Sequence, residues 1–446
     1  MIRLLRKKKI IFLLLYFILL LNFIINRYII NNSKFSQDNF VTIKNSSSKP
    51  LTKQKILEDL TFSQKTIKKI DNIKRLLVYQ ESAFGSPNSG AKKCRDDLEF
   101  EIIIDKSKSL EADLTFYHMY APKINEKKKK NSYTIVFTME SEAHNPDVLQ
   151  SWANADFRMW YNLDKSFPEP VTYFDMRVHL ADLLSPPIVE FEKKTNDAPI
   201  VWIISNCNAF NGREKYIKNL MTLVKIDSYG ACLNNKMTHT ADRMKGNIEL
   251  FTRYKFVIVI ENSNCEDYVT EKLVHAVASG SIPIVAGKDN KPDYLKFIPR
   301  NSYINIYDFK SPKKLAEHLL NVSKNKALYE SYLSFKRRHE YNRDYLNQLK
   351  LSELIQLANR IFNPNDIFLK EIVAKEKSEN KICKIARYIV DNDPETIQKE
   401  IEKKKSKRPL TNEVCLPEGN LSTDFEIKLN LTAQIGNMRN FFKKHF

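Results

Sequence analysis

The stretch from Tyr254 to Gly287 constrains the fold of this chain more than any other part of the sequence. It reads YKFVIVIENSNCEDYVTEKLVHAVASGSIPIVAG, and its first apolar run, residues 256–260, has the length of one buried strand. After a polar loop, apolar residues recur at the spacing of one helix face: Val269, Leu273, Val274 and Val277. Gly280 ends this helical pattern, and residues 282–286 form a second apolar run. Strand, loop, helix and strand in this order predict a parallel α/β sheet.

The loop after the first of these strands is where we expect a ligand. In parallel α/β sheets, ligands bind at the carboxyl ends of the strands. This loop and the first turn of the helix carry polar and charged side chains: Glu261, Asn262, Tyr268, Glu271 and Lys272. A lysine beside the free N–H groups of a helix N-terminus favours a phosphate. The stretch is therefore typical of one half of a nucleotide-binding domain.

The composition disfavours several other classes of protein. The chain has 446 residues, enough for two domains, but nine glycines and neither a GxGxxG nor a GxxxxGK[ST] motif. The formal net charge is +19, yet the lysines are spread over tails, loops and helix faces without an RNA-binding signature. The six cysteines show no CxxC or Cys/His metal spacing. We therefore expect neither a nucleic-acid partner nor a metal site.

The amino-terminal residues indicate a membrane anchor. Residues 1–9 are rich in lysine and arginine, and an apolar run covers residues 10–21 and continues at 23–25. About 20 such residues span a bilayer, and no small-residue cleavage site follows, which disfavours a cleaved signal peptide. Because the stronger basic flank precedes the run, the amino terminus should stay cytosolic. We expect a cytosolic tail at 1–9, a signal-anchor transmembrane helix at 10–30 and a lumenal body, the topology of a single-pass type II membrane protein.

A stem is expected between the anchor and the folded body, at residues 31–73. It is polar up to residue 50 and then places apolar residues at heptad-like intervals: Ile56, Leu60, Ile67 and Ile70. A short self-associating helix, which would give a homodimer, and a weakly helical stalk both fit this pattern. Five Asn-x-Ser/Thr sequons agree with a lumenal body: Asn31, Asn45, Asn321, Asn420 and Asn430.

Two α/β domains are expected, at residues 74–190 and 191–364, followed by a charged C-terminal extension at 365–446. A proline-rich, charged stretch, residues 185–199, is the expected linker between the domains. Candidate strands of the first domain lie at 75–80, 99–104, 113–119, 133–139 and 157–162. Those of the second lie at 200–205, 224–230, 256–260, 282–286 and 303–309.

Two charged residues follow strand ends in these domains. Glu140 comes directly after the apolar strand 133–139, where a carboxylate can act as a general base, although the sequence alone favours a loop or helix-capping glutamate. Arg213 lies at the start of the helix that follows strand 200–205, where a guanidinium can give bidentate hydrogen bonds to a diphosphate. A surface arginine is the alternative.

These stretches resemble the α1,3-fucosyltransferase family (glycosyltransferase family 10), in an invertebrate-like form. The 254–287 stretch, with YKF, ENS, DYVTEK and IPIV, is similar to the donor-site signature of that family in residue types and spacing. FTMESEAH is similar to its acceptor-domain segment at Glu140, Ser141 and His144, and NGREKY to its phosphate-binding element. The resemblance implies a GT-B fold, in which two facing Rossmann-like α/β domains enclose a cleft, the first binding the acceptor and the second GDP-fucose.

The resemblance also implies a reaction. A family member is a glycosyltransferase (hexosyltransferase) of the Golgi membrane that transfers L-fucose from GDP-fucose, with inversion, to the 3-hydroxyl of GlcNAc in glycoprotein or glycolipid glycans. Glu140 would be the base, and Arg213 and Lys272 would neutralise the departing GDP. The other donor-binding residues implied are Asn262, Tyr268, Glu271 and Tyr254. GDP-fucose is the donor substrate, and no tightly bound cofactor or metal is implied; Asp391-Asn392-Asp393 has the DxD form but lies outside both sheets, where a helix cap fits better.

The cysteines add one expectation drawn from the resemblance. Relatives carry a cysteine pair early in the first domain and another after the second, and here Cys94 and Cys383 each match one member of a pair. The resemblance therefore implies a Cys94–Cys383 disulfide. The pairing of the remaining cysteines is left open: Cys207, Cys232, Cys265 and Cys415.

Two other functions stay open from the sequence. One is a GT-B glycosyltransferase that uses another nucleotide sugar, and the other is an inactive, membrane-anchored glycan-binding protein. The retention of charged loop residues argues against decay of the site: Glu140, Arg213, Glu271 and Lys272. Whether the acceptor is a terminal lactosamine or the GlcNAc of an N-glycan core is also open.

Overall fold

The structure is a computed structural model, and it describes most of the chain beyond residue 73. The described residues are 74–81, 89–95, 97–119, 131–144, 154–168, 170–173, 176–237, 243–337, 341–362, 366–368, 381–406 and 411–425. The expected cytosolic tail, transmembrane helix and stem, and the sequons at Asn31, Asn45 and Asn430, lie outside these ranges. Within the ranges, no helix has both the length and the apolar character needed to cross a bilayer. The chain divides into the units Met1–Lys68 and Lys69–Phe446, and all described residues belong to the second.

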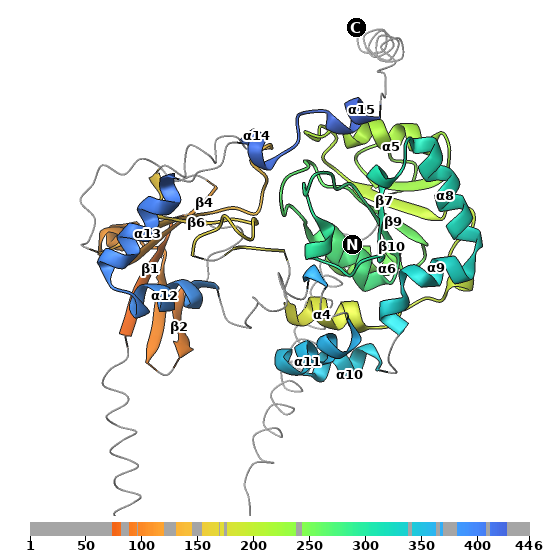
Figure 1. Ribbon diagram of the computed structural model, residues 1–446. Coiled ribbons are helices and arrows are strands. Elements are labelled where there is room, and N and C mark those ends of the chain that lie inside the picture. The colour runs from red at the N-terminus through yellow and green to blue at the C-terminus, as the bar shows by residue number, and fades with distance from the viewer. Residues whose placement is uncertain are drawn as a thin grey trace, which may run out of the picture. The chain divides into compact units, whose positions relative to one another are not determined.

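The first sheet has six strands in the order β2-β3-β1-β4-β5-β6 (Figure 1). Its strands are β1 (Lys74–Gln80), β2 (Gly90–Arg95), β3 (Leu98–Ile103), β4 (Leu114–His118), β5 (Tyr133–Phe137) and β6 (Phe157–Met159). All neighbours pair in parallel except β2, which pairs with β3 in an antiparallel register. The five strands expected in this domain are present. Strand β2 was not predicted, because it is an edge strand with exposed lysines and no apolar alternation.

The second sheet is wholly parallel, with five strands in the order β11-β10-β9-β7-β8. The strands are β7 (Ile200–Ile204), β8 (Ile226–Gly230), β9 (Phe256–Val259), β10 (Ile282–Val285) and β11 (Ile304–Asn305). The connecting helices are α5 (Arg213–Met221), α6 (Arg243–Phe251), α7 (Glu271–Ser279) and α8 (Pro312–Lys324). The expected strand at 303–309 is shorter than predicted, because the Asn305 side chain accepts a hydrogen bond from the N–H of Tyr307 and starts the 3-10 turn η5 (Ile306–Asp308).

Helix ends in this domain follow local sequence signals. The Thr270 hydroxyl accepts a hydrogen bond from the N–H of Lys272 and begins α7, and Gly280 ends it in the left-handed conformation, with φ of 70°. Ser311 caps α8, with Pro312 at its first position. The site loops are thus anchored to helices with well-defined starts.

Apolar residues cover both faces of the second sheet. One of the helices that pack there precedes the expected linker in the sequence. Helix α4 (Met176–Leu184) buries Leu180, Leu183 and Leu184 in the core that also holds Val201 of β7. Helix α4, which precedes the boundary expected at residue 191, therefore packs in the core of the second sheet. The other short elements are η1 (Lys106–Glu111), η3 (Phe191–Lys193), η4 (Tyr294–Lys296), η6 (Ser334–Arg337), α9 (Lys326–Tyr332), α10 (Arg343–Gln348) and α11 (Leu351–Ile361).

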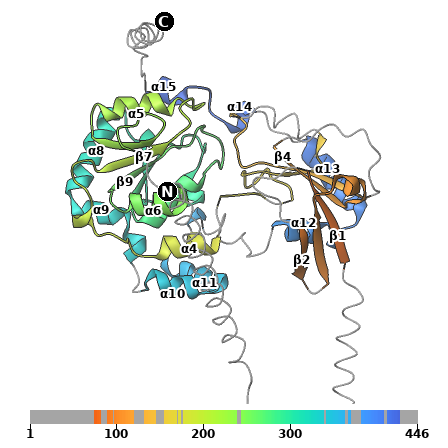
Figure 2. The same cartoon turned by 180° about the vertical axis from the view of Figure 1, so that it is seen from behind.

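The C-terminal extension is partly folded and packs on both sheets. Helices α12 (Lys381–Asp391) and α13 (Pro394–Ser406) contribute Ile385, Ile397 and Ile401 to the core of the first sheet, and both views show them beside β1 and β2 (Figure 2). Several charged residues of α13 are exposed (Glu395, Lys399, Glu402 and Lys403), while its isoleucines recur at i and i+4, so its charged composition conceals an apolar face. The Asp393 carboxylate accepts from the N–H of Thr396 at 3.0 Å, which confirms the helix-cap interpretation of the DxD-like motif.

Three disulfides occur among the described residues. Cys94 of β2 is bonded to Cys383 of α12, which is the pairing that the resemblance implied. The sequence left the pairing of the other four cysteines open, and the structure joins Cys207 to Cys232 and Cys265 to Cys415. Each of these two bonds holds a loop that follows the carboxyl end of a strand in the second sheet.

Candidate active site

The residue expected to act as the base contacts a residue expected to bind the donor. Glu140 is half-buried directly beyond β5, and its Oε2 accepts a hydrogen bond from the hydroxyl of Tyr268 at 3.1 Å. Burial, reinforced by the negative charge of Glu140, raises the pKa of Tyr268 well above its usual value. The phenol therefore keeps its proton and remains a donor to the carboxylate.

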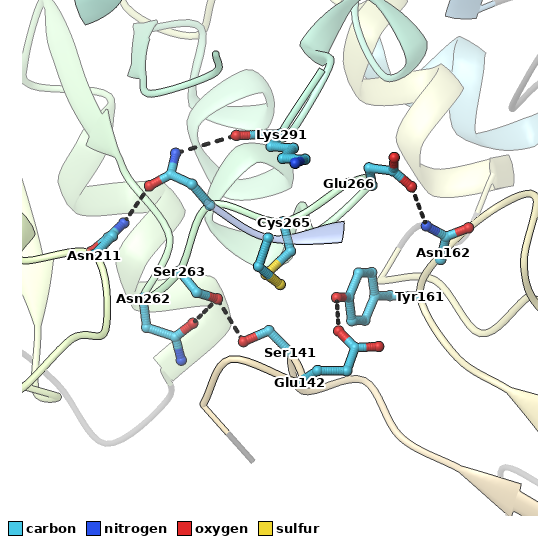
Figure 3. The surroundings of a disulfide bond; sticks show 12 residues. Ser141, Glu142, Tyr161, Asn162, Asn211, Asn262, Ser263, Cys265, Glu266 and Lys291 are labelled. Atoms are coloured by element: carbon cyan, nitrogen blue, oxygen red, sulfur yellow. Dashed lines mark hydrogen bonds between the residues drawn. A yellow bond between two sulfur atoms is a disulfide. The ribbon is translucent and has the colours of Figure 1, made fainter. Parts of the chain in front are cut away.

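A second contact joins the same two loops. The hydroxyls of Ser141 and Ser263 lie 2.5 Å apart, and both serines are fully buried (Figure 3). Ser141 follows Glu140 in the loop after β5, and Ser263 belongs to the loop after β9. Two hydrogen bonds thus fix the loop that carries Glu140 against the 260–270 loop, the segment between β9 and α7.

Lys272 is held at the N-terminus of α7 by a buried carboxylate. Its Nζ donates to Glu261 Oε2 and to Thr270 Oγ1, each at 2.8 Å, and lies 3.4 Å from Glu271 Oε1. Burial lowers the pKa of Lys272, but the carboxylates of Glu261 and Glu271 raise it more, so that the net pKa lies above its ordinary value. The site therefore keeps an ammonium group beside the free N–H groups of a helix start.

Glu261 is a residue of this site to which the sequence assigned no role. Its side chain is only 2% exposed, and it accepts hydrogen bonds from both the N–H and the hydroxyl of Thr270 at 2.8 Å. The sequence did offer one indication of a functional role: Glu261 is the first charged residue after a fully apolar strand. A carboxylate so buried requires the neighbouring cation, so Glu261 and Lys272 form one unit.

Arg213 is placed where the sequence predicted, at the first position of α5, but its guanidinium is occupied. The side chain is 1% exposed, and it donates to the carbonyl oxygens of Ile260 at 2.7 Å and Asn206 at 3.1 Å. Nε lies 3.4 Å from Glu214 Oε1. These contacts use three of the five N–H groups of the guanidinium. Arg213 thereby ties the 205–212 loop, the segment between β7 and α5, to the end of β9.

Asn262 and Tyr254 lie in different surroundings. The carbonyl oxygen of Asn262 accepts from the N–H of Asn211 at 3.2 Å, which places Asn262 between the two loops. The hydroxyl of Tyr254 instead donates to Asp227 Oδ2 at 2.7 Å and lies 3.2 Å from the hydroxyl of Tyr229. Tyr254 is thus held at β8, in a hydrogen-bonded group of its own.

Glu142 is a further buried acid that sequence reasoning did not single out. It is 1% exposed, and its Oε2 accepts from the hydroxyl of Tyr161 at 2.5 Å (Figure 3). The ring of Tyr161 packs on that of Tyr268 with centroids 4.8 Å apart. Burial raises the pKa of Glu142 to about 7. No sequence motif marks this pairing, since Tyr161 and Glu142 meet only through the fold.

A carboxylate oxygen of Glu142 also lies within 4.8 Å of the sulfur atoms of Cys265 and Cys415. Because these sulfurs are bonded to each other, they are not the thiolates that ligate metals. The remaining motif residue, His144, is exposed, and its Nε2 lies 3.2 Å from the amide nitrogen of Asn206.

The two described sequons differ in exposure. Asn321 is exposed on α8 and fits the prediction of a glycosylation site. Asn420 is only 4% exposed, and its Nδ2, the atom that a glycan would occupy, donates to the hydroxyl of Tyr307 at 2.8 Å. The prediction for Asn420 therefore does not fit the folded chain.

Comparisons with known proteins cover much of this region. Glycoprotein 3-alpha-L-fucosyltransferase A of Drosophila melanogaster is 31% identical over 292 residues, which are 63% of this chain and 56% of that protein. GDP-fucose protein O-fucosyltransferase 3 of Gallus gallus is 35% identical over 146 residues, or 31% of this chain and 30% of that protein. The chain thus spans between about a third and just over half of the length of these curated relatives.

Among solved structures, a crystal structure of an alpha1,3-fucosyltransferase with GDP matches 68% of this chain and 97% of its own, with 16% identity and a TM-score of 0.43. At the sequence level, residues 191–403 match the family model described as glycosyltransferase family 10 (fucosyltransferase) C-term. That range contains Arg213, Tyr268 and Lys272, but not Glu140. The chain therefore carries a glycosyltransferase family 10 (fucosyltransferase) domain.

Proposed function

We propose that this protein is an inverting α1,3-fucosyltransferase, which transfers L-fucose from GDP-fucose to the 3-hydroxyl of GlcNAc in glycoprotein or glycolipid glycans. The hydrogen bond between Tyr268 and Glu140 carries the proposal, because it joins a carboxylate to the loop that the family domain supplies. The relatives are named as a 3-alpha-L-fucosyltransferase and a GDP-fucose protein O-fucosyltransferase, and these names support the donor and the bond formed.

In the proposed reaction, Glu140 accepts the proton of the acceptor hydroxyl as that oxygen attacks the anomeric carbon of fucose. The bond from this carbon to the diphosphate breaks on the opposite face, and GDP leaves with the bonding electrons. Tyr268 orients the carboxylate through its hydrogen bond. A fixed donor of this kind limits the geometries that the base can adopt before the attack.

We assign the stabilisation of the negative charge that develops on GDP to the N-terminus of α7. Lys272 supplies an ammonium group there, and the first turn of α7 supplies free N–H groups. Arg213 and Asn262 hold the 205–212 and 260–270 loops together beside it, and Glu271 is the partly exposed acid expected to bind ribose hydroxyls. Tyr254 is hydrogen-bonded to Asp227 of β8 and to none of the other proposed donor residues in the described part of the chain.

The architecture proposed for this function is GT-B, with the first sheet in the acceptor-binding domain and the second in the GDP-fucose-binding domain. The amino-terminal anchor would place both in the Golgi lumen, attached to the membrane through the stem, where self-association would give a homodimer. Three disulfides among the described residues fit an oxidising compartment.

A second candidate differs in the acceptor. The relative from Gallus gallus is named a protein O-fucosyltransferase, and it is 35% identical over 146 residues. A hydroxyl of a protein side chain would then replace the sugar hydroxyl, while the donor loops would keep the same roles.

A turnover assay decides among these functions. Purified protein is incubated with GDP-fucose and, separately, with a lactosamine, an N-glycan with its chitobiose core, and serine- or threonine-containing peptides. We expect release of GDP with one of the two glycans. Peptide fucosylation would select the second candidate, and the absence of turnover on all acceptors, with bound GDP detected by thermal shift, would indicate a binding protein. Stabilisation by UDP instead of GDP would reject the donor.

A further inference from the structure

A short C-terminal segment, residues 411–425, packs against both loops of the candidate donor site. It contains α14 (Thr411–Val414) and α15 (Asn420–Asp424), and it lies beyond residue 403, where the match to the family domain ends. Leu421 is fully buried in the core that covers one face of the second sheet. The segment is therefore integrated into the domain although the family match does not include it.

On one side, the segment is bonded to the 260–270 loop. The disulfide Cys265–Cys415 is flanked by two backbone hydrogen bonds: the N–H of Glu266 donates to the carbonyl of Val414 at 2.7 Å, and that of Leu416 donates to Asn264 at 2.8 Å. Together these contacts form a short antiparallel bridge (Figure 3). The same loop carries Tyr268, three residues after Cys265.

On the other side, the segment holds the 205–212 loop. The N–H of Gly419 donates to the carbonyl of Phe210 at 2.7 Å, and that of Leu421 donates to Asn211 at 3.1 Å. Gly212 packs so closely that a Cβ there would lie 2.9 Å from Ser422 Oγ and 3.4 Å from Gly419 Cα. This loop leads directly into Arg213.

Three buried asparagines connect the segment to the two loops. Asn211 Nδ2 donates to Asn264 Oδ1 at 2.8 Å and to the carbonyl of Glu261 at 2.9 Å. Asn264 Nδ2 donates to the carbonyl of Ala286 at 2.8 Å, and Asn420 Nδ2 lies 3.5 Å from Asn264 Oδ1. Since all three amides are at least 96% buried, their hydrogen bonds specify one arrangement of the loops.

We propose that residues 411–425 are a positioning element of the donor site, in which the Cys265–Cys415 disulfide and the Asn420 amide hold the two loops in the geometry that binds GDP-fucose. This inference rests on the proposed function for the identity of the ligand. Neither Cys415 nor Asn420 needs to touch the donor. They act through Asn264 and Asn211, which set the positions of the residues that do. Without the segment, the loops would have to be ordered by the nucleotide itself, and part of the binding free energy would be lost.

The test compares two disulfide-free variants of the full chain. Cys265→Ala/Cys415→Ala removes the bond to the donor loop, and the matched control Cys94→Ala/Cys383→Ala removes the bond between β2 and α12. We expect the first to raise the KM for GDP-fucose and the Kd for GDP by about tenfold or more, with the acceptor KM unchanged. The control should keep both donor constants within about twofold, whatever its thermal stability.

Hydrogen exchange of the 205–212 and 260–270 loops gives a readout that does not need turnover. It should accelerate in both loops in Cys265→Ala/Cys415→Ala and stay as in the wild type in the control. Unchanged exchange together with unchanged GDP affinity would overturn the inference. If the wild type transfers no fucose but exchange responds as expected, the proposed function fails while the positioning role stands.

A single substitution keeps the test decisive if the double variant does not fold. Asn420→Ala leaves every disulfide intact and removes the amide that reaches Asn264 and Tyr307. It should raise the KM for GDP-fucose severalfold while changing kcat less. Asn321→Ala, which removes an exposed asparagine and its sequon on α8, is its matched control and should leave the KM within about twofold. Equal donor constants in both single variants would reject a role for Asn420.

Discussion

The hydroxyl of Tyr268 lies 3.1 Å from Oε2 of Glu140, although 128 residues separate them in the chain. The tyrosine comes from the 260–270 loop of the second sheet, and the glutamate follows β5 of the first. A proton donor from the second sheet's loop therefore holds the proposed base, which follows the first sheet. The first two predictions test this relationship directly.

Glu140→Gln should lower kcat by about 10²- to 10⁴-fold, because the amide cannot accept the proton of the acceptor hydroxyl. Its carbonyl oxygen can still accept the hydrogen bond from Tyr268, so the loops should keep their positions. Calorimetry should give a Kd for GDP within about twofold of the wild type. A parallel loss of GDP affinity would assign Glu140 to donor binding instead.

Tyr268→Phe removes the donor to Glu140 but keeps the ring that packs on Tyr161. We expect kcat to fall by about 10- to 100-fold, the effect of losing a hydrogen bond to a charged group. Thermal unfolding should change little, since the aromatic packing remains. Initial rates at saturating donor and acceptor measure the effect, and an unaltered kcat would show that Glu140 is oriented by other groups.

Lys272→Ala should raise the Kd for GDP by about tenfold or more and destabilise the fold by about 1–3 kcal/mol, since it leaves Glu261 buried without its cation. The double variant Glu261→Gln/Lys272→Met separates these effects. It removes both charges, so stability should recover while GDP affinity stays low. Recovery of GDP affinity in the double variant would show that Lys272 serves only to neutralise Glu261.

Glu142→Gln should change the pH dependence of stability. Burial raises the pKa of Glu142 from 4.5 to about 7, so the folded protein binds a proton that the unfolded chain releases between these values. In the wild type, the contribution of Glu142 to the free energy of unfolding is therefore full below about pH 4.5 and is lost as pH rises to about 7. The glutamine variant lacks this titration and should become more stable relative to the wild type across that window, by about 3 kcal/mol at most.

Denaturant unfolding of both proteins at several pH values measures the difference, in which the titration of all other buried groups cancels. If the difference in unfolding free energy between the two proteins does not vary with pH, Glu142 is ionised in the folded state as it is in the unfolded chain. Tyr161, Lys165 and Glu266 are the charged or titratable neighbours that influence this carboxyl group.

Asn321→Gln should shift the electrophoretic mobility of protein made in a glycosylating host, and Asn420→Gln should not. Asn321 is exposed on α8, whereas Asn420 is buried with its amide bonded to Tyr307. Digestion with an endoglycosidase before electrophoresis should abolish the shift for Asn321. A shift caused by Asn420→Gln would mean that the C-terminal segment is displaced in the glycosylated chain.

The parts of the fold that were predictable depend on local signals. The apolar run before Glu261, the capping Thr270 and the terminal Gly280 each act within a few residues, so the β9–α7–β10 unit could be read directly. Strand β2 could not, because an exposed edge strand needs no apolar pattern.

The parts that were missed depend on pairings between distant residues. Helix α4 lies in the stretch expected to belong to the first domain, and only its burial in the same core as Val201 reveals that it belongs with the second sheet. Arg213 was predicted at its observed position, but the carbonyls that occupy its guanidinium belong to Asn206 and Ile260, at the starts of two loops that only the fold brings together. Neither the partner of Cys265 nor the bond from Glu142 to Tyr161 leaves a trace in local sequence.

The residues after 381 pack against both sheets, and this limits when the protein can fold during synthesis. The core of the first sheet needs Ile397 and Ile401, and the 260–270 loop is bonded to Cys415, so neither is complete when the ribosome has made only the residues up to 380. The Cys94–Cys383 bond spans 289 residues and Cys265–Cys415 spans 150. At about 5–20 residues per second, Cys94 waits on the order of 15–60 s for its partner to be made. Truncation just after residue 380 therefore removes core residues from both sheets at once.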